Sequence, residues 1–290
     1  MADVSMVGRL AGGDHACLTF SDAEERIDLV ASFVRTGLRS GHRVVCWTDS
    51  IPPDDLARAL AERSVRHGAA IRRGQLTIAT VNSSLLDGGS ASAAEMISVL
   101  THEVDRAARD GYPGVRIAAD MCWATQPLAA GDQLVAFENA AARLFADGRL
   151  CLICQYDRDR FDAVTLAFAS ESHPKAVAAQ VYYDTPLLRI CRQYSPAGVR
   201  VAGELDYRQQ QEFEHALGES LRLDRTMHLN LRDLAYIDAA CASLIVRAAR
   251  RLPASRRMII TCRGAVRTVL DLVGANSAPQ IRVTLAHGHA

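Results

Sequence analysis

Residues 227–252 read M-H-L-N-L-R-D-L-A-Y-I-D-A-A-C-A-S-L-I-V-R-A-A-R-R-L, and this stretch decides the fold. Its first residues alternate in polarity, with Met227, Leu229 and Leu231 on one side, which predicts a strand with one buried face. From Cys241 onward, apolar residues recur at helical spacing, which predicts an amphipathic helix. Asp238 stands between them, where a short carboxylate can accept backbone N–H groups of a helix N-terminus. The stretch therefore predicts a strand, a tight turn and a helix that begins at the surface.

The same stretch resembles the central motif of STAS domains, the fold of bacterial anti-sigma-factor antagonists. In that family a buried strand ends in an Asp-Ser-Ser/Thr-Gly turn that opens a helix, and a partner kinase phosphorylates the serine. The family's Asp matches Asp238, whereas its phosphorylated serine falls on Ala239, which has no hydroxyl. The resemblance implies that an anti-sigma factor or an anti-sigma-factor kinase binds here. The implied partner-binding residues are Asp238, Ala239, Ala240 and Ser243.

Ser243 lies one turn into the predicted helix. We consider two interpretations of it, a substitute phosphate acceptor and a small helix residue packed near the sheet.

Residues 197–290 fit the STAS resemblance over their whole length, with strands expected at 199–205, 257–262 and 281–285. Helices are expected after Asp206 and over 265–273, the second one closed by Gly274. We take residues 181–196 as a linker because two tyrosines and two prolines interrupt the pattern, although 187–190 can form a docked strand.

Residues 1–180 alternate predicted strands and helices, which favours an α/β domain with a mainly parallel sheet. The strands are expected at 15–20, 43–47, 75–80, 115–120 and 150–156. The helices are expected at 23–38, 56–67, 93–109, 134–146 and 161–168, with a Gly/Ser-rich loop at 87–92.

Several spots between residues 12 and 174 resemble the sensory domain of methanogen and methylotroph regulators, the MEDS family. They are His15-Ala-Cys17, Gly114-Val-Arg116 leading to Asp120-Met-Cys-Trp123, Glu138, Cys154-Gln-Tyr156-Asp157 and His173. The resemblance implies a RecA/KaiC-like α/β fold that senses small organic molecules without nucleotide chemistry.

The loop after the first strand argues independently against ATP hydrolysis. A RecA-like ATPase needs a glycine-rich loop there and a lysine that reaches the phosphates. Residues 21–26 read S-D-A-E-E-R, and Lys175 is the only lysine of the chain. Three acids at a helix N-terminus repel phosphate. A residual nucleotide-binding RecA-like protein remains the enzyme-like alternative, and Asp120 with Glu138 is the best carboxylate pair for it.

The carboxyl ends of parallel strands are the usual ligand site of an open α/β sheet. We expect an unidentified small organic ligand there and assign no cofactor and no metal. The expected ligand-binding residues are His15, Cys17, Phe20, Asp120, Trp123, Cys154 and Tyr156. The alternative is a metal or redox sensor in which His15 and Cys17, two residues apart on one strand face, combine with Cys122, Cys154 or His173. Each of these side chains taken singly is also typical of plain packing.

Composition bounds the remaining possibilities. The chain has 290 residues with 33 acidic and 33 basic side chains, so we expect no direct nucleic-acid partner and no membrane association. No apolar run approaches the roughly 20 residues of a membrane span, and the N-terminal residues lack a signal-peptide layout, so we expect a cytoplasmic protein. The eight cysteines are expected to be reduced and mostly buried. The sequence thus predicts a non-enzymatic signalling regulator and leaves a homodimer open.

Overall fold

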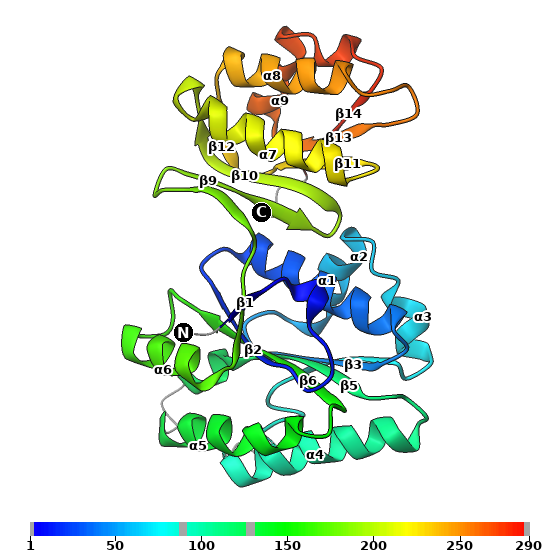
Figure 1. The fold of residues 1–290 in the computed structure, drawn as a ribbon, viewed down its shortest axis with the longest axis vertical. Coiled ribbons are helices and arrows are strands. Elements are labelled where there is room, and N and C mark those ends of the chain that lie inside the picture. The colour runs from blue at the N-terminus through cyan, green and yellow to red at the C-terminus, as the bar shows by residue number, and fades with distance from the viewer. Residues whose placement is uncertain (1–2, 87–91, 126–130, 287–290) are drawn as a thin grey trace. The chain divides into compact units, whose positions relative to one another are not determined.

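The computed structural model describes residues 3–86, 92–125 and 131–286, so most of the expected loop at 87–92 lies outside the described residues. The chain divides into two compact units, Met1–Ala178 and Ala179–Ala290 (Figure 1). Both units combine helices with a sheet, as the sequence predicted. The span 181–196, expected as a linker, carries two strands of the second unit's sheet.

The sheet of the first unit has the strand order β1-β7-β2-β6-β5-β3-β4, and all of its pairings are parallel. Strands β3 and β5 are buried along their whole length. Burial on both faces explains why residues 44–47 of β3 read as an unbroken apolar run. Strands β1 and β7 were not predicted, since three residues are too few to set a pattern. The strands are β1 Asp3–Ser5, β2 His15–Phe20, β3 Arg43–Thr48, β4 Leu76–Thr80, β5 Val115–Asp120, β6 Leu150–Asp157 and β7 Lys175–Val177.

Helices cover both faces of this sheet (Figure 1). One face carries α1 (Ala23–Arg39), α2 (Pro53–Glu62) and α3 (His67–Arg72). On the other, apolar residues of α4 (Ala93–Arg109), α5 (Gly131–Ala141) and α6 (Ala163–Ser172) join the strands in one hydrophobic cluster.

Two helix boundaries differ from the prediction. The single helix expected at 56–67 ends at Glu62, because Ser64 adopts a positive φ of 61° that no helix continues through. The helix expected at 134–146 is α-helical to Ala141 and then tightens into a 3-10 turn, Ala142–Phe145.

The second unit is built on a sheet with the strand order β14-β13-β11-β10-β9-β8, in which β12 also pairs with β10. The pairings among β10, β11, β13 and β14 are parallel, whereas β8 and β9 are antiparallel. The short strand β12 was not predicted; it follows β11 where only a turn was expected. The strands are β8 Val181–Asp184, β9 Leu188–Tyr194, β10 Ala197–Leu205, β11 Met227–Leu231, β12 Leu234–Ile237, β13 Met258–Cys262 and β14 Ile281–Leu285.

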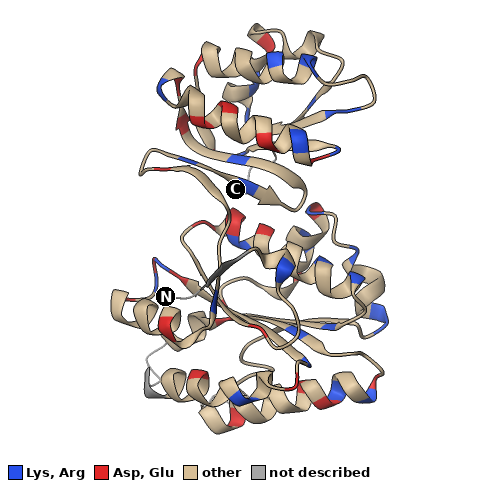
Figure 2. Cartoon of the chain, in the orientation of Figure 1, with Lys and Arg blue, Asp and Glu red and all other residues tan. Residues whose placement is uncertain are grey.

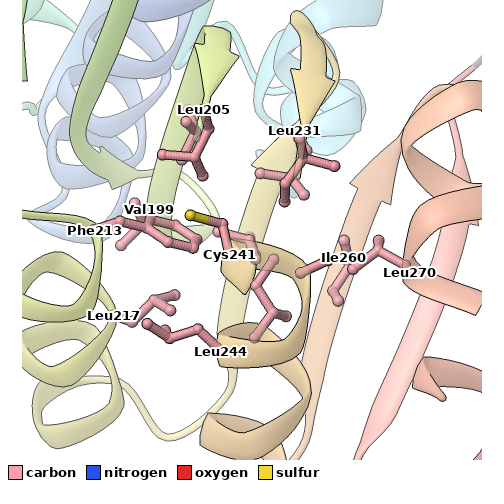
Figure 3. Packing of buried hydrophobic residues seen from close by; sticks show 14 of the residues in the cluster. Val199, Leu205, Phe213, Leu217, Leu231, Cys241, Leu244, Ile260 and Leu270 are labelled. Atoms are coloured by element: carbon pink, nitrogen blue, oxygen red, sulfur yellow. The ribbon is translucent and has the colours of Figure 1, made fainter. Parts of the chain in front are cut away.

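Three helices, α7 (Gln210–Leu223), α8 (Ala239–Arg250) and α9 (Gly264–Leu272), pack their apolar sides onto one face of this sheet. Figure 3 shows Phe213, Leu217, Leu244 and Leu270 of these helices pointing toward the strand residues. The strand with one buried face that residues 227–231 predicted is confirmed, because Met227, Leu229 and Leu231 are all buried in this core.

Two whole-chain expectations can be compared with the structure. The eight cysteines are all free thiols and all buried. Within the ranges that the structure describes, no helix combines the length and the apolar character that crossing a membrane requires.

The close approach of β10 and β11 generates a stability prediction. A Cβ atom added at Gly198 would overlap the backbone carbonyl of its register partner His228, and the backbone of a central strand cannot move aside. We expect Gly198→Ala to lower the free energy of unfolding of the second unit by about 2–4 kcal/mol. Urea unfolding followed by circular dichroism measures this.

The matched control is Gly218→Ala in α7, where nothing lies within 4 Å of the added Cβ. That change should stabilise the helix by up to about 1 kcal/mol. Equal stability of the Gly198→Ala protein and the wild type would contradict the β10–β11 register.

Candidate functional site

A group of buried polar side chains lies on the α5 side of the first sheet, and we call it the buried histidine cluster. Its members come from four elements that are far apart in the sequence. They are His15 on β2, Glu138 on α5, Cys154 and Tyr156 on β6, and His173 at the C-cap of α6. None of them is more than 3% exposed. Burial of this many polar groups is costly unless they are matched to one another or to a ligand.

The carboxylate of Glu138 is the centre of the cluster. Its Oε1 accepts a hydrogen bond of 2.5 Å from the hydroxyl of Tyr156. Its Oε2 lies 3.3 Å from Nε2 of His15 and 3.4 Å from Nε2 of His173. The Sγ of Cys154 lies 3.5 Å from the same nitrogen of His15. Carboxylate, imidazole and thiol groups therefore converge on one point.

The two imidazole rings are held in place by their surroundings. Nδ1 of His173 lies 2.6 Å from the carbonyl oxygen of Ala169, which can only accept, so this nitrogen carries the proton. The ring of His15 stacks on Phe145, with centroids 4.5 Å apart, and tilts against His173 at 4.1 Å. These contacts fix the direction in which both Nε2 atoms point.

Burial controls the protonation of the cluster. Desolvation, followed by the proximity of His173, holds the pKa of His15 well below its ordinary value. Desolvation, reinforced by the Glu138 carboxylate, raises the pKa of Cys154 and of Tyr156 well above their ordinary values. The same two causes raise the pKa of the neighbouring Cys17 to about 12. The cluster thus presents a neutral imidazole, thiols and a phenol around one carboxylate.

A second polar group lies on the α1 side of the same sheet, centred on the ion pair between Arg26 and Asp120. The guanidinium lies 2.8 Å from Oδ2 of Asp120, and it also donates to Gln155 at 2.8 Å and to Ser50 at 2.6 Å. The hydroxyl of Ser50 donates to the same carboxylate oxygen at 2.6 Å. Arg26 stacks over the ring of Phe20 at 4.7 Å. Burial by itself would raise the pKa of Asp120, but Arg26 and Ser50 together lower it well below its ordinary value.

The expected ligand-binding residues are therefore divided between the two faces of the sheet. His15, Cys154 and Tyr156 lie together in the buried histidine cluster, and Cys17 lies beside them as the register partner of Cys154. Phe20 and Asp120 lie in the Arg26 group. Trp123 is buried in the hydrophobic cluster of the α5 side.

Arg26 and Ser50 were missed by the sequence reasoning, and no spacing in the sequence signals either of them. The pair Asp120 with Glu138, considered as two catalytic carboxylates, is separated by the sheet, since each lies in a different group.

In the second unit, the turn before α8 is tied down by the Asp238 carboxylate. Its Oδ1 accepts from the backbone N–H of Cys241 at 2.8 Å, as expected of a helix N-cap. Its Oδ2 accepts from the backbone N–H of Tyr207 at 2.8 Å, which links the turn to the start of the α7 segment. Ala239 and Ala240, the first two residues of the helix, are exposed. The turn is thus a rigid surface feature.

The neighbourhood of this turn is aromatic. Tyr207 and Tyr236 are 69% and 52% exposed, and tyrosine is a residue type enriched at protein interfaces. The hydroxyl of Ser243 donates to the carbonyl of Ala239 at 2.6 Å, inside the first turn of the helix. We call Tyr207, Tyr236, Asp238, Ala239 and Ala240 the α8 turn surface.

Comparison with known families finds two matches. Residues 14–174 match the model described as MEthanogen/methylotroph, DcmR Sensory domain (MEDS). Residues 192–287 match the STAS domain. Both resemblances read from the sequence are thereby confirmed. Comparison with curated proteins finds no match.

Solved structures similar to the chain include two archaeal proteins. The flagellar accessory protein FlaH from Methanocaldococcus jannaschii is 11% identical, with a TM-score of 0.44, and the match covers 67% of this chain and 86% of that one. The KaiC-like protein PH0186 from Pyrococcus horikoshii OT3 is 12% identical, with a TM-score of 0.45, and the match covers 63% and 79%.

The Arg26–Asp120 pair generates a prediction with a defined pH dependence. Asp120→Asn leaves a buried guanidinium unpaired, so we expect a loss of about 3–5 kcal/mol in the free energy of unfolding at pH 7. The folded-state pKa of Asp120 is depressed. Its stabilisation is therefore complete above the unfolded pKa of about 3.9 and is lost as the pH falls toward the folded value. The difference between the two proteins should shrink below about pH 4.

Urea unfolding at pH 7, 5 and 3, followed by tryptophan fluorescence, measures this, because both tryptophans lie in the first unit. The control is Asp55→Asn in the exposed pair Asp55–Arg58, where a change within about 0.5 kcal/mol is expected. A difference that grows on acidification would contradict the depressed pKa.

Proposed function

Since the chain belongs to the MEDS family and carries a STAS domain in its second unit, we propose that it is a non-enzymatic signalling regulator. The pair of domains makes it a regulator with a sensory domain and an anti-sigma-factor-antagonist-like domain. In the proposal, the first unit senses a small organic molecule. It thereby controls the binding of the second unit to an anti-sigma factor or an anti-sigma-factor kinase.

The observation that carries the proposal is the α8 turn surface. The Asp238 carboxylate uses both oxygens to hold backbone N–H groups, so the turn keeps one shape without a partner. Preorganisation of this kind lowers the entropic cost of binding. The exposed rings of Tyr207 and Tyr236 beside it offer the aromatic anchors that protein interfaces use.

The substitution at position 239 sets this regulator apart from the family pattern. A phosphoserine there would add negative charge beside Asp238 and disrupt docking. Alanine cannot carry that charge, so we propose that the docking surface is permanently in its unmodified form. The hydroxyl of Ser243 already donates within the helix, which argues against its use as a substitute acceptor.

Several contacts support a role without nucleotide hydrolysis. Lys175, the chain's only lysine, is paired with Asp14 at 2.7 Å. The N-terminus of α1 is capped by the Asp22 carboxylate and carries Glu24 and Glu25 in its first turn. Negative charge at this position opposes the binding of phosphate groups, which need a helix N-terminus free of acids.

Overall charge fits a protein partner. Figure 2 shows acidic and basic side chains on both units, and the chain carries 33 of each. Because the chain has no excess of basic residues, the proposal assigns it a protein partner and no nucleic acid.

We place the sensed ligand at the carboxyl ends of β2 and β5, beside Phe20 and Asp120 on the α1 side of the sheet. These side chains are at most 7% exposed, so a ligand that enters has to displace neighbouring groups. Displacement of this kind gives the ligand-bound form a different set of contacts. A sensor requires such a difference, since a ligand shifts an equilibrium only by its differential affinity for two states.

The docking proposal predicts the effect of a bulky cation on the α8 turn surface. We expect Ala239→Arg to weaken binding to the cognate anti-sigma factor or kinase at least tenfold, a loss of about 1.4 kcal/mol or more. The measurement is isothermal titration calorimetry against the candidate anti-sigma proteins of the same organism. The matched control is Ala254→Arg, an exposed alanine beyond the other end of α8. Equal weakening by both variants, or by neither, would remove the turn from the interface.

The absence of a hydroxyl at position 239 predicts that restoring a serine there restores phosphorylation. We expect Ala239→Ser to become a phosphate acceptor for the partner kinase, whereas the wild type and Ser243→Ala stay unmodified. Incubation with kinase and labelled ATP, followed by peptide mass spectrometry, measures the transfer. Phosphate on Ser243 of the wild type would contradict this, because it would show that the kinase modifies a serine at position 243 in place of the family's serine at position 239.

A further inference from the structure

The buried histidine cluster has a geometry that its own hydrogen bonds do not explain. One donor atom from each of His15, Glu138, Cys154 and His173 lies within 4.8 Å of all the others. All four residues are buried, and they belong to four separate elements. Nitrogen, oxygen and sulfur donors in this combination are typical zinc ligands.

The separations match the edges of a coordination tetrahedron. Bond lengths of about 2.0–2.3 Å from zinc to nitrogen, oxygen and sulfur place tetrahedral ligand atoms roughly 3.3–3.6 Å apart. The Oε2 atom of Glu138 lies 3.3 Å from His15 Nε2 and 3.4 Å from His173 Nε2. The Sγ of Cys154 lies 3.5 Å from His15 Nε2. Three of the distances between the proposed ligand atoms therefore already match those of a tetrahedral zinc site.

Two acceptors face each other in the cluster. Because Nδ1 of His173 carries its proton toward Ala169, the Nε2 atom presents a lone pair. That lone pair points at Oε2 of Glu138 across 3.4 Å, and within the described residues neither of these two atoms has a hydrogen-bond partner. A cation between the two atoms, either a proton or a metal ion, removes this mismatch.

The outer contacts match those that metal sites use. A metal-bound histidine usually donates its second nitrogen to a carbonyl, as His173 does to Ala169. The Tyr156 hydroxyl occupies Oε1 of Glu138 and leaves Oε2 for an ion. Both contacts orient the ligand atoms toward the centre before any ion is present.

From this geometry, we propose that the first unit binds one divalent metal ion, best matched by zinc, through His15 Nε2, Glu138 Oε2, Cys154 Sγ and His173 Nε2. Binding displaces the thiol proton of Cys154 to solvent and forms the metal–thiolate bond. The carboxylate and the thiolate together balance the two positive charges, so the buried site is neutral. A thiolate with imidazoles selects zinc or a similar transition ion over magnesium or calcium.

All four coordination positions are filled by protein side chains, so the site is closed and has no place for a reactive water. The ion joins β2, α5, β6 and the end of α6, and it therefore holds two helices against the sheet. This inference does not depend on the proposed function, because it concerns only how the first unit holds its α5 and α6 helices.

The experiment uses the full-length chain, purified under reducing conditions and stripped with a chelator. Titration with Zn²⁺ in competition with a chromophoric chelator should give about one equivalent per chain. Thermal unfolding should shift upward on loading, because an ion that binds only the folded form stabilises it. Replacement with Co²⁺ should produce the charge-transfer absorption of a cobalt–thiolate bond.

Variants assign the ligands. Cys154→Ser and His173→Gln should weaken Zn²⁺ binding by at least about tenfold. Cys154→Ser should also abolish the charge-transfer band. The matched control is Cys17→Ser, which removes a buried thiol from the register partner of Cys154 but lies outside the four ligands. This variant should keep the full stoichiometry.

Two outcomes overturn the proposal. Uptake of less than about 0.1 equivalent of Zn²⁺ by the wild-type protein would reject the metal site. Loss of the ion in Cys17→Ser, with retention in Cys154→Ser, would reject the ligand assignment. If a ligand variant fails to fold, the stoichiometry and the Co²⁺ spectrum of the wild type decide the question.

Discussion

A carboxylate that leaves water has to be matched by donors or by a cation, and this constraint organises the first unit. On the α1 face of the sheet, Asp120 is matched completely by Arg26 and by Ser50. On the α5 face, Glu138 meets one hydroxyl donor, from Tyr156, and two imidazoles. Within the described residues, protein donors match the first carboxylate, whereas the second carries the cation site that we propose. The two buried carboxylates thus lie on opposite faces of one sheet.

In the second unit, a carboxylate near the surface is also matched by hydrogen-bond donors. The Asp238 carboxylate is complemented by the backbone N–H groups of Cys241 and Tyr207, not by a basic side chain. Backbone donors at a helix N-terminus hold the charge in place without covering it. Ala239 and Ala240, which follow Asp238, are exposed. In the proposed complex, a partner contacts this backbone and the negative charge of Asp238.

Much of the fold follows from local pattern, and the site follows only in part. Period-2 and helical spacing predicted the second unit's motif because its core uses one face of each strand. The alternation of side chains along β2 also predicts that the expected ligand-binding residues lie on two faces of the sheet. His15 and Cys17 are two residues apart and share one face, whereas Phe20 is an odd number of residues from both and lies on the other face. The strand-end site expected from the sequence therefore combined residues from both faces of the sheet.

Other features had no local signal. Strands β1 and β7 have three residues each, and β8 and β9 lie among tyrosines and prolines that suggest a linker. Arg26 reads as an ordinary helix residue, since nothing in the sequence reveals that it reaches Asp120. Glu138 was expected beside Asp120, and His173 was named as one of several partners for His15 and Cys17. The sequence did not predict that Glu138 joins these histidines, because α5 and the end of α6 meet β2 through tertiary packing.

A regulator without a hydroxyl at position 239 needs control from another part of the chain, and connectivity offers a route. His173 ends α6, β7 follows at Lys175–Val177, and the second unit begins at Ala179. The segment that leaves the buried histidine cluster is thus the segment that enters the second unit's β8 strand. Control by this route requires that the end of α6 has two arrangements, which both a ligand of the first unit and a partner of the second can bias.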